Sequence, residues 1–155
     1  MSTSDGHAEH PLPPNATRGG IALTRDELIA WGERFGRAAT APLVVALAGE
    51  LGSGKTTLVQ AICRGYGVAE DVTSPTFAIV HQYRAPASSV YHLDLYRIEH
   101  ERELTNVAWD EIVGDHALVL VEWAERAGSR LPNAHVPIDL EHLPGDESRR
   151  LLLAG

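Results

Sequence analysis

The residues best suited to chemistry lie in the stretch from Gly49 to Thr57, which reads GELGSGKTT. A glycine, four unspecified residues and then Gly-Lys-Ser/Thr form the phosphate-binding loop pattern of nucleotide-binding proteins. The glycines let successive backbone N–H groups face an anion. The Lys55 ammonium can span the β- and γ-phosphates, and the Thr56 hydroxyl can bind Mg²⁺. The expected nucleotide-binding residues are Gly49, Glu50, Leu51, Gly52, Ser53, Gly54, Lys55, Thr56 and Thr57.

The segments on either side of this loop support that interpretation. Residues 43–48 are an apolar run typical of a buried parallel strand, and residues 58–64 carry the apolar stripe of a helix. A strand, a loop and a helix in this order are the context that the motif requires. Lys55 is also the one lysine among thirteen basic residues. This position therefore departs from the preference for arginine found everywhere else in the chain.

A nucleotide site with Mg²⁺ needs a second acidic group, usually at the end of a neighbouring buried strand. Glu122 follows the most apolar run of the chain, residues 117–121, and has the better pattern for a metal-binding carboxylate. Asp94 ends a mixed strand and could orient the attacking water, contact a metal-bound water or cap a turn. An ordinary strand-end carboxylate is the alternative for Glu122. Both acids are candidate catalytic residues together with Lys55.

A polar connection after the first strand–helix unit carries Ser74, Pro75 and Thr76. Nucleotide hydrolases use such a loop as a switch that the γ-phosphate and Mg²⁺ order, although a turn with a purely geometric role fits equally well. Arg97 could neutralise phosphate charge or form a surface ion pair. The remaining candidates are histidines without the paired spacing of a zinc site, and they are assigned no role: His81, His92, His100, His116, His135 and His142.

Composition limits the class of protein. The chain has 155 residues, one cysteine and a net charge of −8, which suits a single domain without a disulfide. No apolar run reaches membrane-spanning length and the first residues do not form a signal peptide, so we expect a cytoplasmic protein with no membrane contact. An acidic chain lacks the footprint of a protein that holds nucleic acid by itself. We therefore expect any contact with RNA to run through a partner.

The remaining elements follow from local patterns. Residues 1–20 read as a disordered tail, and residues 21–155 as one domain. Thr24 and Glu27 form a capping box that opens a helix to about residue 39. Strands are expected at residues 21–23, 77–83, 90–96, 117–121, 136–141 and 149–153, with a helical start at residues 99–103.

Four motifs stand in an order and at spacings that resemble the TsaE (YjeE) family, the bacterial ATPases of tRNA threonylcarbamoyladenosine biosynthesis. They are the phosphate loop, Ser-Pro-Thr-Phe at residues 74–77, His-Leu-Asp-Leu-Tyr-Arg at residues 92–97, and Val-Glu-Trp at residues 121–123. The loop alone occurs in many families, whereas the other three together are much more specific. The resemblance covers residues 26–140.

The resemblance implies a three-layer P-loop NTPase fold of the α/β class, with a mainly parallel central sheet and short antiparallel additions. It implies ATP and Mg²⁺ as ligands, with Lys55 and Thr56 on the phosphates and metal. Glu122 would be a metal-binding Walker-B carboxylate, Asp94 a catalytically important acid and Thr76 a switch-like residue. The implied partners are the threonylcarbamoyl-transferase subunit TsaD and its paralogue TsaB, with tRNA contacted only indirectly. The implied role is ATP hydrolysis that supports modification of adenosine 37 in tRNAs reading ANN codons. Because no residue is an obvious strong general base, we expect weak hydrolysis that depends on the partners.

The chain departs from the family pattern at two positions. The family often has glycine where Ala108 stands and proline where Ala124 stands. The main alternative function is a P-loop small-molecule kinase, although no arginine-rich lid is evident. A GTPase would need a second lysine for its Asn-Lys-x-Asp element, and a scaffold would not need Lys55, Thr56 and Glu122.

Overall fold

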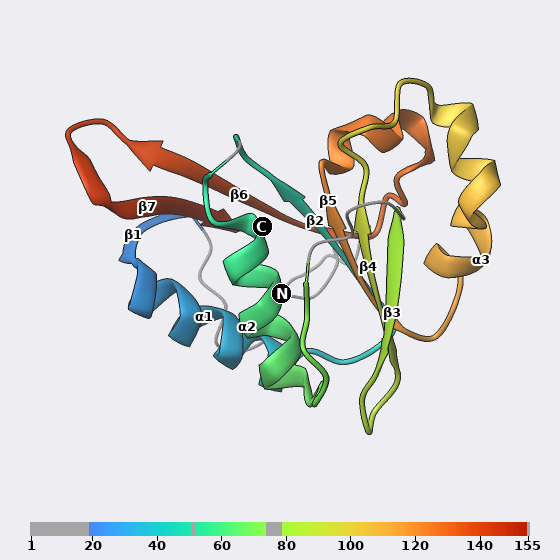
Figure 1. Cartoon of the computed structure of the whole chain (residues 1–155), viewed down its shortest axis with the longest axis horizontal. Coiled ribbons are helices and arrows are strands. Elements are labelled where there is room, and N and C mark those ends of the chain that lie inside the picture. The colour runs from blue at the N-terminus through green and yellow to red at the C-terminus, as the bar shows by residue number, and fades with distance from the viewer. Residues whose placement is uncertain (1–18, 51, 74–78, 155) are drawn as a thin grey trace, which may run out of the picture.

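The computed structural model describes residues 19–50, 52–73 and 79–154. Within these residues seven strands form one sheet in the order β1-β7-β6-β2-β5-β4-β3 (Figure 1). The four central strands β6, β2, β5 and β4 are parallel, while β7, β1 and β3 add antiparallel pairs at the two edges. The mainly parallel sheet with antiparallel additions is therefore confirmed. The strands are β1 Gly19–Thr24, β2 Leu43–Ala48, β3 Val80–Arg84, β4 Ser89–Asp94, β5 Leu118–Glu122, β6 Val136–Leu143 and β7 Asp146–Ala154.

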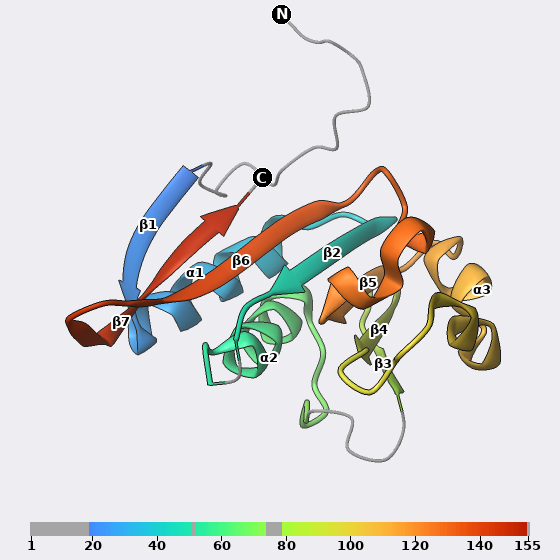
Figure 2. The same ribbon diagram turned by 90° about the horizontal axis from the view of Figure 1, so that it is seen from above.

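Helices cover both faces of this sheet and complete three layers. The α-helices are α1 Arg25–Ala38, α2 Lys55–Tyr66 and α3 Trp109–Val113, and the 3₁₀ helices are η1 Glu101–Val107 and η2 Ala124–Arg130. Alternate residues of β2 point to opposite faces. Val45 and Leu47 pack into the cluster under α1 and α2, whereas Val44 and Ala46 pack under η1, α3 and η2. Both views place α1 beside α2 and α3 at the other end of the molecule (Figure 2).

The two long helices approach each other closely because glycines lie in their contact. A Cβ atom at Gly36 of α1 would lie 2.1 Å from the carbonyl oxygen of Ile62, and one at Gly65 of α2 would lie 2.1 Å from that of Glu33. No side chain fits at either separation. This close contact between α1 and α2 fixes α2, and with it the phosphate loop, against the rest of the domain.

Most of the expected elements are confirmed by the structure. The capping box of Thr24 and Glu27 is present, and the predicted strands near residues 80 and 90 form the β3–β4 hairpin. The first strand begins at Gly19, slightly before the expected domain start at residue 21. The expected tail lies outside the described residues up to residue 18. No helix of the described chain has the length and hydropathy needed to cross a membrane.

Candidate nucleotide site

The loop between β2 and α2 is built for an anion. Gly49, Gly52 and Gly54 have φ angles of 144°, 77° and 107°, which L side chains rarely adopt. The α2 helix begins directly after Gly54, and no side chain caps its N-terminus among the described residues. The first N–H groups of a helix lack acceptors within it and carry partial positive charge, so they attract phosphate. Leu51 lies outside the described residues.

The Lys55 side chain is folded back onto its own loop. Its Nζ donates hydrogen bonds to the carbonyl oxygen of Gly49 and, at 3.1 Å, to that of Glu50. The ammonium also lies 4.5 Å from the ring centroid of Trp123, a favourable cation–π distance. Only 5% of Lys55 is exposed. Burial lowers the pKa of Lys55, and nearby carboxylates, first among them Glu122, partly oppose that shift.

The two candidate acids lie together. Asp94 and Glu122 are register partners at the carboxyl ends of β4 and β5, and Leu47 of β2 pairs with Glu122 on the other side. Ligands of open α/β sheets bind at this edge. Burial raises the pKa of Asp94, and Glu122 raises it further, while the hydrogen bond from the Tyr96 N–H to Oδ1 at 3.0 Å opposes both effects. Glu122 is 3% exposed.

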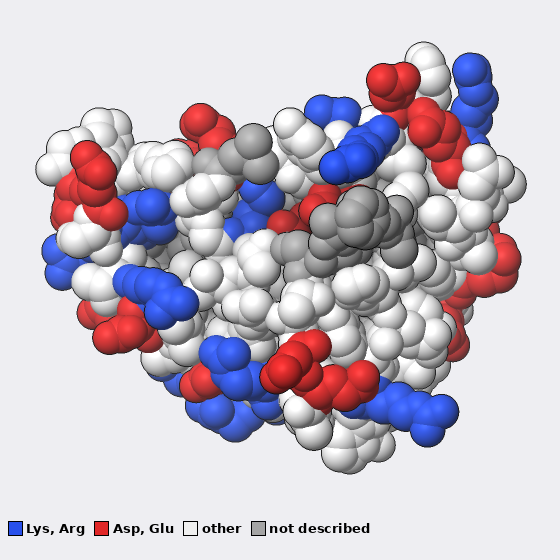
Figure 3. Space-filling model, in the orientation of Figure 1, with Lys and Arg blue, Asp and Glu red and all other residues white. Residues whose placement is uncertain are grey.

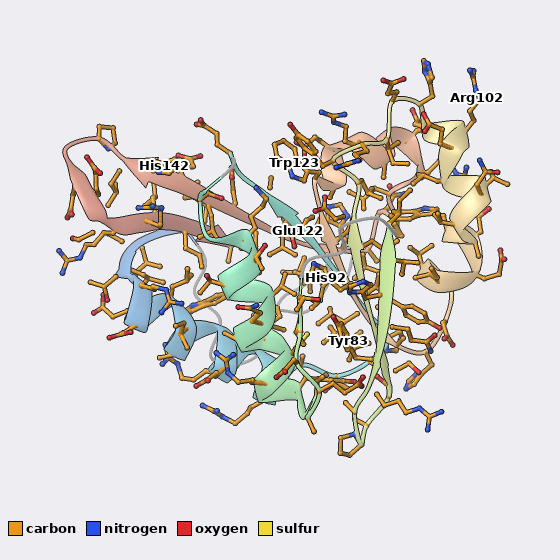
Figure 4. All side chains as sticks on the ribbon, in the orientation of Figure 1. Tyr83, His92, Arg102, Glu122, Trp123 and His142 are labelled. Atoms are coloured by element: carbon orange, nitrogen blue, oxygen red, sulfur yellow. The ribbon has the colours of Figure 1, made fainter. Side chains whose placement is uncertain are left out.

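Sequence reasoning missed a third member of this group, His92. The Nε2 atom of His92 lies 2.6 Å from Oε2 of Glu122, and both side chains are buried. Figure 4 shows the two labelled residues close together between α2 and β4. Strand alternation was the signal available in the sequence, because His92 stands two residues before Asp94 and therefore on the same face of the strand.

Two of the hollows beside the phosphate loop share Gly52, Ser53, Gly54 and Thr57. A cleft of about 390 Å³ contains the catalytic candidates and is lined by Gly52, Ser53, Gly54, Lys55, Thr56, Thr57, Asp94, Glu122 and Trp123. A second hollow of about 370 Å³ is walled by the β1–α1 junction and the start of β7 and is lined by Leu23, Thr24, Arg25, Leu28, Gly52, Ser53, Gly54, Thr57, Glu147, Ser148 and Arg150. Nothing in the sequence placed these two chain ends beside the loop.

The oxygen atoms in the cleft suit Mg²⁺. The Thr56 hydroxyl and the carboxylates of Glu122 and Asp94 line it, and Mg²⁺ prefers such hard oxygen donors. No group of three His, Cys, Asp or Glu side chains in the described chain could hold a metal by itself. Mg²⁺ usually keeps several waters and binds through one or two carboxylates plus substrate phosphates. The residues present therefore fit a metal that arrives with a nucleotide.

The predicted switch residues Ser74, Pro75 and Thr76 lie outside the described residues, so that assignment stays a prediction. The described flanks of this segment are anchored near the site. On one side Gln60 of α2 donates to the carbonyl oxygen of Val72 at 2.8 Å. On the other side the Asp94 N–H donates to the carbonyl oxygen of Ile79 at 2.9 Å. Arg97, the candidate for charge neutralisation, is exposed and does not line the cleft.

Surface charge is mixed on the side that carries the site. Among the described residues, basic and acidic side chains are interspersed over the face in Figure 3, and no broad basic patch gathers there. Proteins that hold nucleic acid unaided usually present such a patch.

Known proteins resemble this chain over most of its length. The family model described as "Threonylcarbamoyl adenosine biosynthesis protein TsaE" matches residues 23–151. A Nostoc protein named tRNA threonylcarbamoyladenosine biosynthesis protein TsaE is 35% identical over 129 residues, which is 81% of this chain and 78% of the relative. A Treponema pallidum protein of the same name is 32% identical and covers 86% of this chain and 98% of its own length. The crystal structure of Bacillus subtilis YdiB has the same fold, with a TM-score of 0.69 at 24% identity over 90% of this chain and 88% of that one.

Proposed function

Because the chain belongs to the TsaE family, we propose that it is a Mg²⁺-dependent ATPase that supports threonylcarbamoyladenosine (t6A37) modification of tRNAs reading ANN codons. One observation carries the catalytic part of this proposal. Lys55, Asp94 and Glu122 come from three separate elements and line one cleft beside the phosphate loop. These residue types at the carboxyl edge of a parallel sheet are the parts that phosphoryl transfer requires.

The two hollows suggest how ATP would lie. The β-phosphate would sit over the N–H groups at the start of α2, and the γ-phosphate would extend into the cleft with the acids. The nucleoside would then occupy the second hollow, which shares Gly52, Ser53, Gly54 and Thr57 with the cleft. Leu23 and Leu28 give that hollow an apolar wall, and Thr24, Ser148 and Arg150 add polar groups, a mixture typical of small-ligand sites.

Each catalytic candidate has a distinct role in this proposal. Lys55 exchanges the carbonyl oxygens of Gly49 and Glu50 for the β- and γ-phosphates and neutralises the charge that develops on them. Thr56 and Glu122 would hold Mg²⁺, which supplies further charge neutralisation when bound. Asp94, at the γ-phosphate end of the cleft, orients the attacking water. No residue is placed as a strong general base, so we expect weak turnover by the chain alone.

We infer that the chain works with the threonylcarbamoyl-transferase subunit TsaD and its paralogue TsaB in the cytoplasm. Docking on this pair would position the loop from Ser74 to Phe77 and the Asp94 carboxylate for catalysis, or add positive charge to the cleft. A bound partner that positions a segment in this way can complete a catalytic site. The net charge of −8 supports contact with tRNA through these partners and not directly.

The test is Mg²⁺-dependent ATP turnover by the chain alone and with the purified TsaD–TsaB pair. We expect stimulation by the pair, and its loss in Lys55→Ala. Equal turnover with and without a pair that is shown to be active would contradict partner dependence. Phosphate transfer to a small metabolite by the chain alone would instead favour the kinase alternative.

A further inference from the structure

The buried contact between His92 and Glu122 has no role in the proposed function so far. We propose that His92 is a positioning residue that fixes the Glu122 carboxylate for the Mg²⁺–nucleotide complex. This inference rests on the proposed function, because it assigns a partner to the carboxylate that is proposed to bind the metal. The evidence is the hydrogen-bond contact between the His92 ring and Glu122, the burial of both side chains and the position of His92 on β4.

The strand register places the His92 imidazole beside the Glu122 carboxylate, on the side away from the carboxyl edge of the sheet. His92 pairs with Leu120 and Asp94 with Glu122 in the parallel β4–β5 ladder, so all four side chains lie on one face. His92 and Glu122 are diagonal neighbours on that face, and the 2.6 Å contact joins Nε2 to Oε2. His92 is fully buried, so it reaches the cleft only through Glu122.

The contact with Glu122 indicates which nitrogen of His92 carries a proton. An ionised carboxylate can only accept hydrogen bonds, so Nε2 must carry the proton in this pair. The other nitrogen, Nδ1, is buried and has no hydrogen-bond partner among the described residues. The contact with Glu122 therefore places a donating N–H at Nε2.

This bond decides how Glu122 meets the cleft. Because Oε2 accepts a hydrogen bond from His92, Oε1 and the second lone pair of Oε2 are what the carboxylate can offer a ligand. Its orientation is also set before the ligand arrives, because both side chains are buried and each lies on a strand of the sheet. Hydrogen bonds that orient metal-binding carboxylates in this way typically change metal affinity by about 10- to 100-fold when removed.

Three substitutions separate this role from simple packing. Gln places an amide N–H the same number of bonds from Cβ as Nε2, so His92→Gln can restore the donor. Asn places its amide nitrogen where Nδ1 stands, so His92→Asn is polar but cannot reach Glu122. His92→Leu keeps bulk and removes the donor. Thermal unfolding of each variant identifies any that do not fold.

The measurement is ADP affinity of the full chain by calorimetry, first with a chelator and then over a series of Mg²⁺ concentrations. We expect wild type and His92→Gln to need similar Mg²⁺ concentrations for the increase in ADP affinity. His92→Asn and His92→Leu should need Mg²⁺ concentrations about 10- to 100-fold higher. Affinity for ADP without Mg²⁺ should be unchanged in all four. Imidazole ¹⁵N spectra of the metal-free wild type should show His92 protonated at Nε2.

Several outcomes would overturn the inference. Folded His92→Asn and His92→Leu proteins with a wild-type Mg²⁺ requirement would exclude the positioning role, as would a ring protonated at Nδ1. A His92→Gln protein as impaired as His92→Leu would show that the donor is not what matters. Failure of the wild-type chain to bind ADP would reject the proposed function itself, and any metal-related role of His92 with it.

Discussion

Asp94 and Glu122 face each other as register partners on the parallel strands β4 and β5. Two carboxylates this close at the end of a buried sheet repel each other and lose hydration, and burial and Glu122 both raise the pKa of Asp94. Such an arrangement is unfavourable for folding alone. It becomes favourable when a cation shares the space, as expected for a site that admits a nucleotide with its metal.

Asp94→Asn should stabilise the fold at neutral pH while abolishing ATP turnover. The raised pKa means that the folded chain holds the Asp94 charge less well than the unfolded chain does, so wild-type stability falls as pH rises through the folded pKa. As pH decreases, wild-type Asp94 becomes protonated and the difference between the two proteins should shrink. Urea unfolding at several pH values from about 4 to 7 measures this. A variant less stable than wild type at pH 7 would contradict it.

Lys55→Ala should remove nucleotide-dependent function and leave the fold intact. The side chain interacts with loop carbonyl oxygens and the Trp123 ring and not with the apolar core. Turnover should fall by about 10²-fold or more, as for other lost donors to developing charge. Arg64→Ala is the control, because Arg64 also lies on α2 but pairs with Glu33 at the surface. Circular dichroism that reports an unfolded Lys55→Ala protein would refute the prediction.

Ser148→Trp should block the hollow beside the phosphate loop. Ser148 lines it, so an indole there should weaken ATP binding by about 10-fold or more while leaving inorganic triphosphate binding unchanged. Arg149→Trp is the control, since the next residue of a strand points to the opposite face and Arg149 does not line the hollow. Calorimetric titrations with both ligands decide the matter. Equal losses for ATP and triphosphate would place the nucleoside elsewhere.

Gly36→Ala should destabilise the domain by about 1–3 kcal/mol or more, because the added methyl group would overlap the backbone of α2 at Ile62. The neighbouring exposed Arg37 provides the control, and Arg37→Ala should change stability by no more than about 0.5 kcal/mol. Denaturant unfolding compares them. Similar stabilities for both variants would show that the two helices can separate at little cost.

Ala108→Gly should stabilise the protein by about 1 kcal/mol. Ala108 is exposed and has a φ of 59°, in the left-handed region that favours glycine. The positive φ is a physical reason to prefer glycine at this position. Ala30→Gly, inside α1, should have the opposite effect of about 1 kcal/mol. Unfolding curves in which both substitutions destabilise the chain would disprove the assigned strain.

The parts of the fold that were predictable are those with local causes. The capping box joins Thr24 and Glu27 within one turn, and the glycines of the phosphate loop and the apolar run before it are continuous in sequence. Glu122 and Asp94 were found because each ends its own strand. Their pairing follows once both strands are known to be parallel neighbours.

The parts that were missed depend on contacts between distant segments. The hydrogen bond between His92 and Glu122 joins the neighbouring strands β4 and β5. The hydrophobic periodicity of the sequence alone does not identify the partner of a buried histidine. The cation–π contact between Lys55 and Trp123 depends on a backbone turn at Trp123 with a φ of 57°, which propensity does not predict for tryptophan. The second hollow forms only because β1 and β7, which are far apart in the sequence, pair in the sheet.

The pairing of β1 with β7 joins the two ends of the described chain. A ribosome completes the phosphate loop and its acids before it adds Glu147, Ser148 and Arg150, which close the second hollow. The nascent chain would therefore acquire its full nucleotide site only after β7 has left the exit tunnel. Any truncation before β7 should yield a loop that meets phosphate but retains the nucleotide poorly.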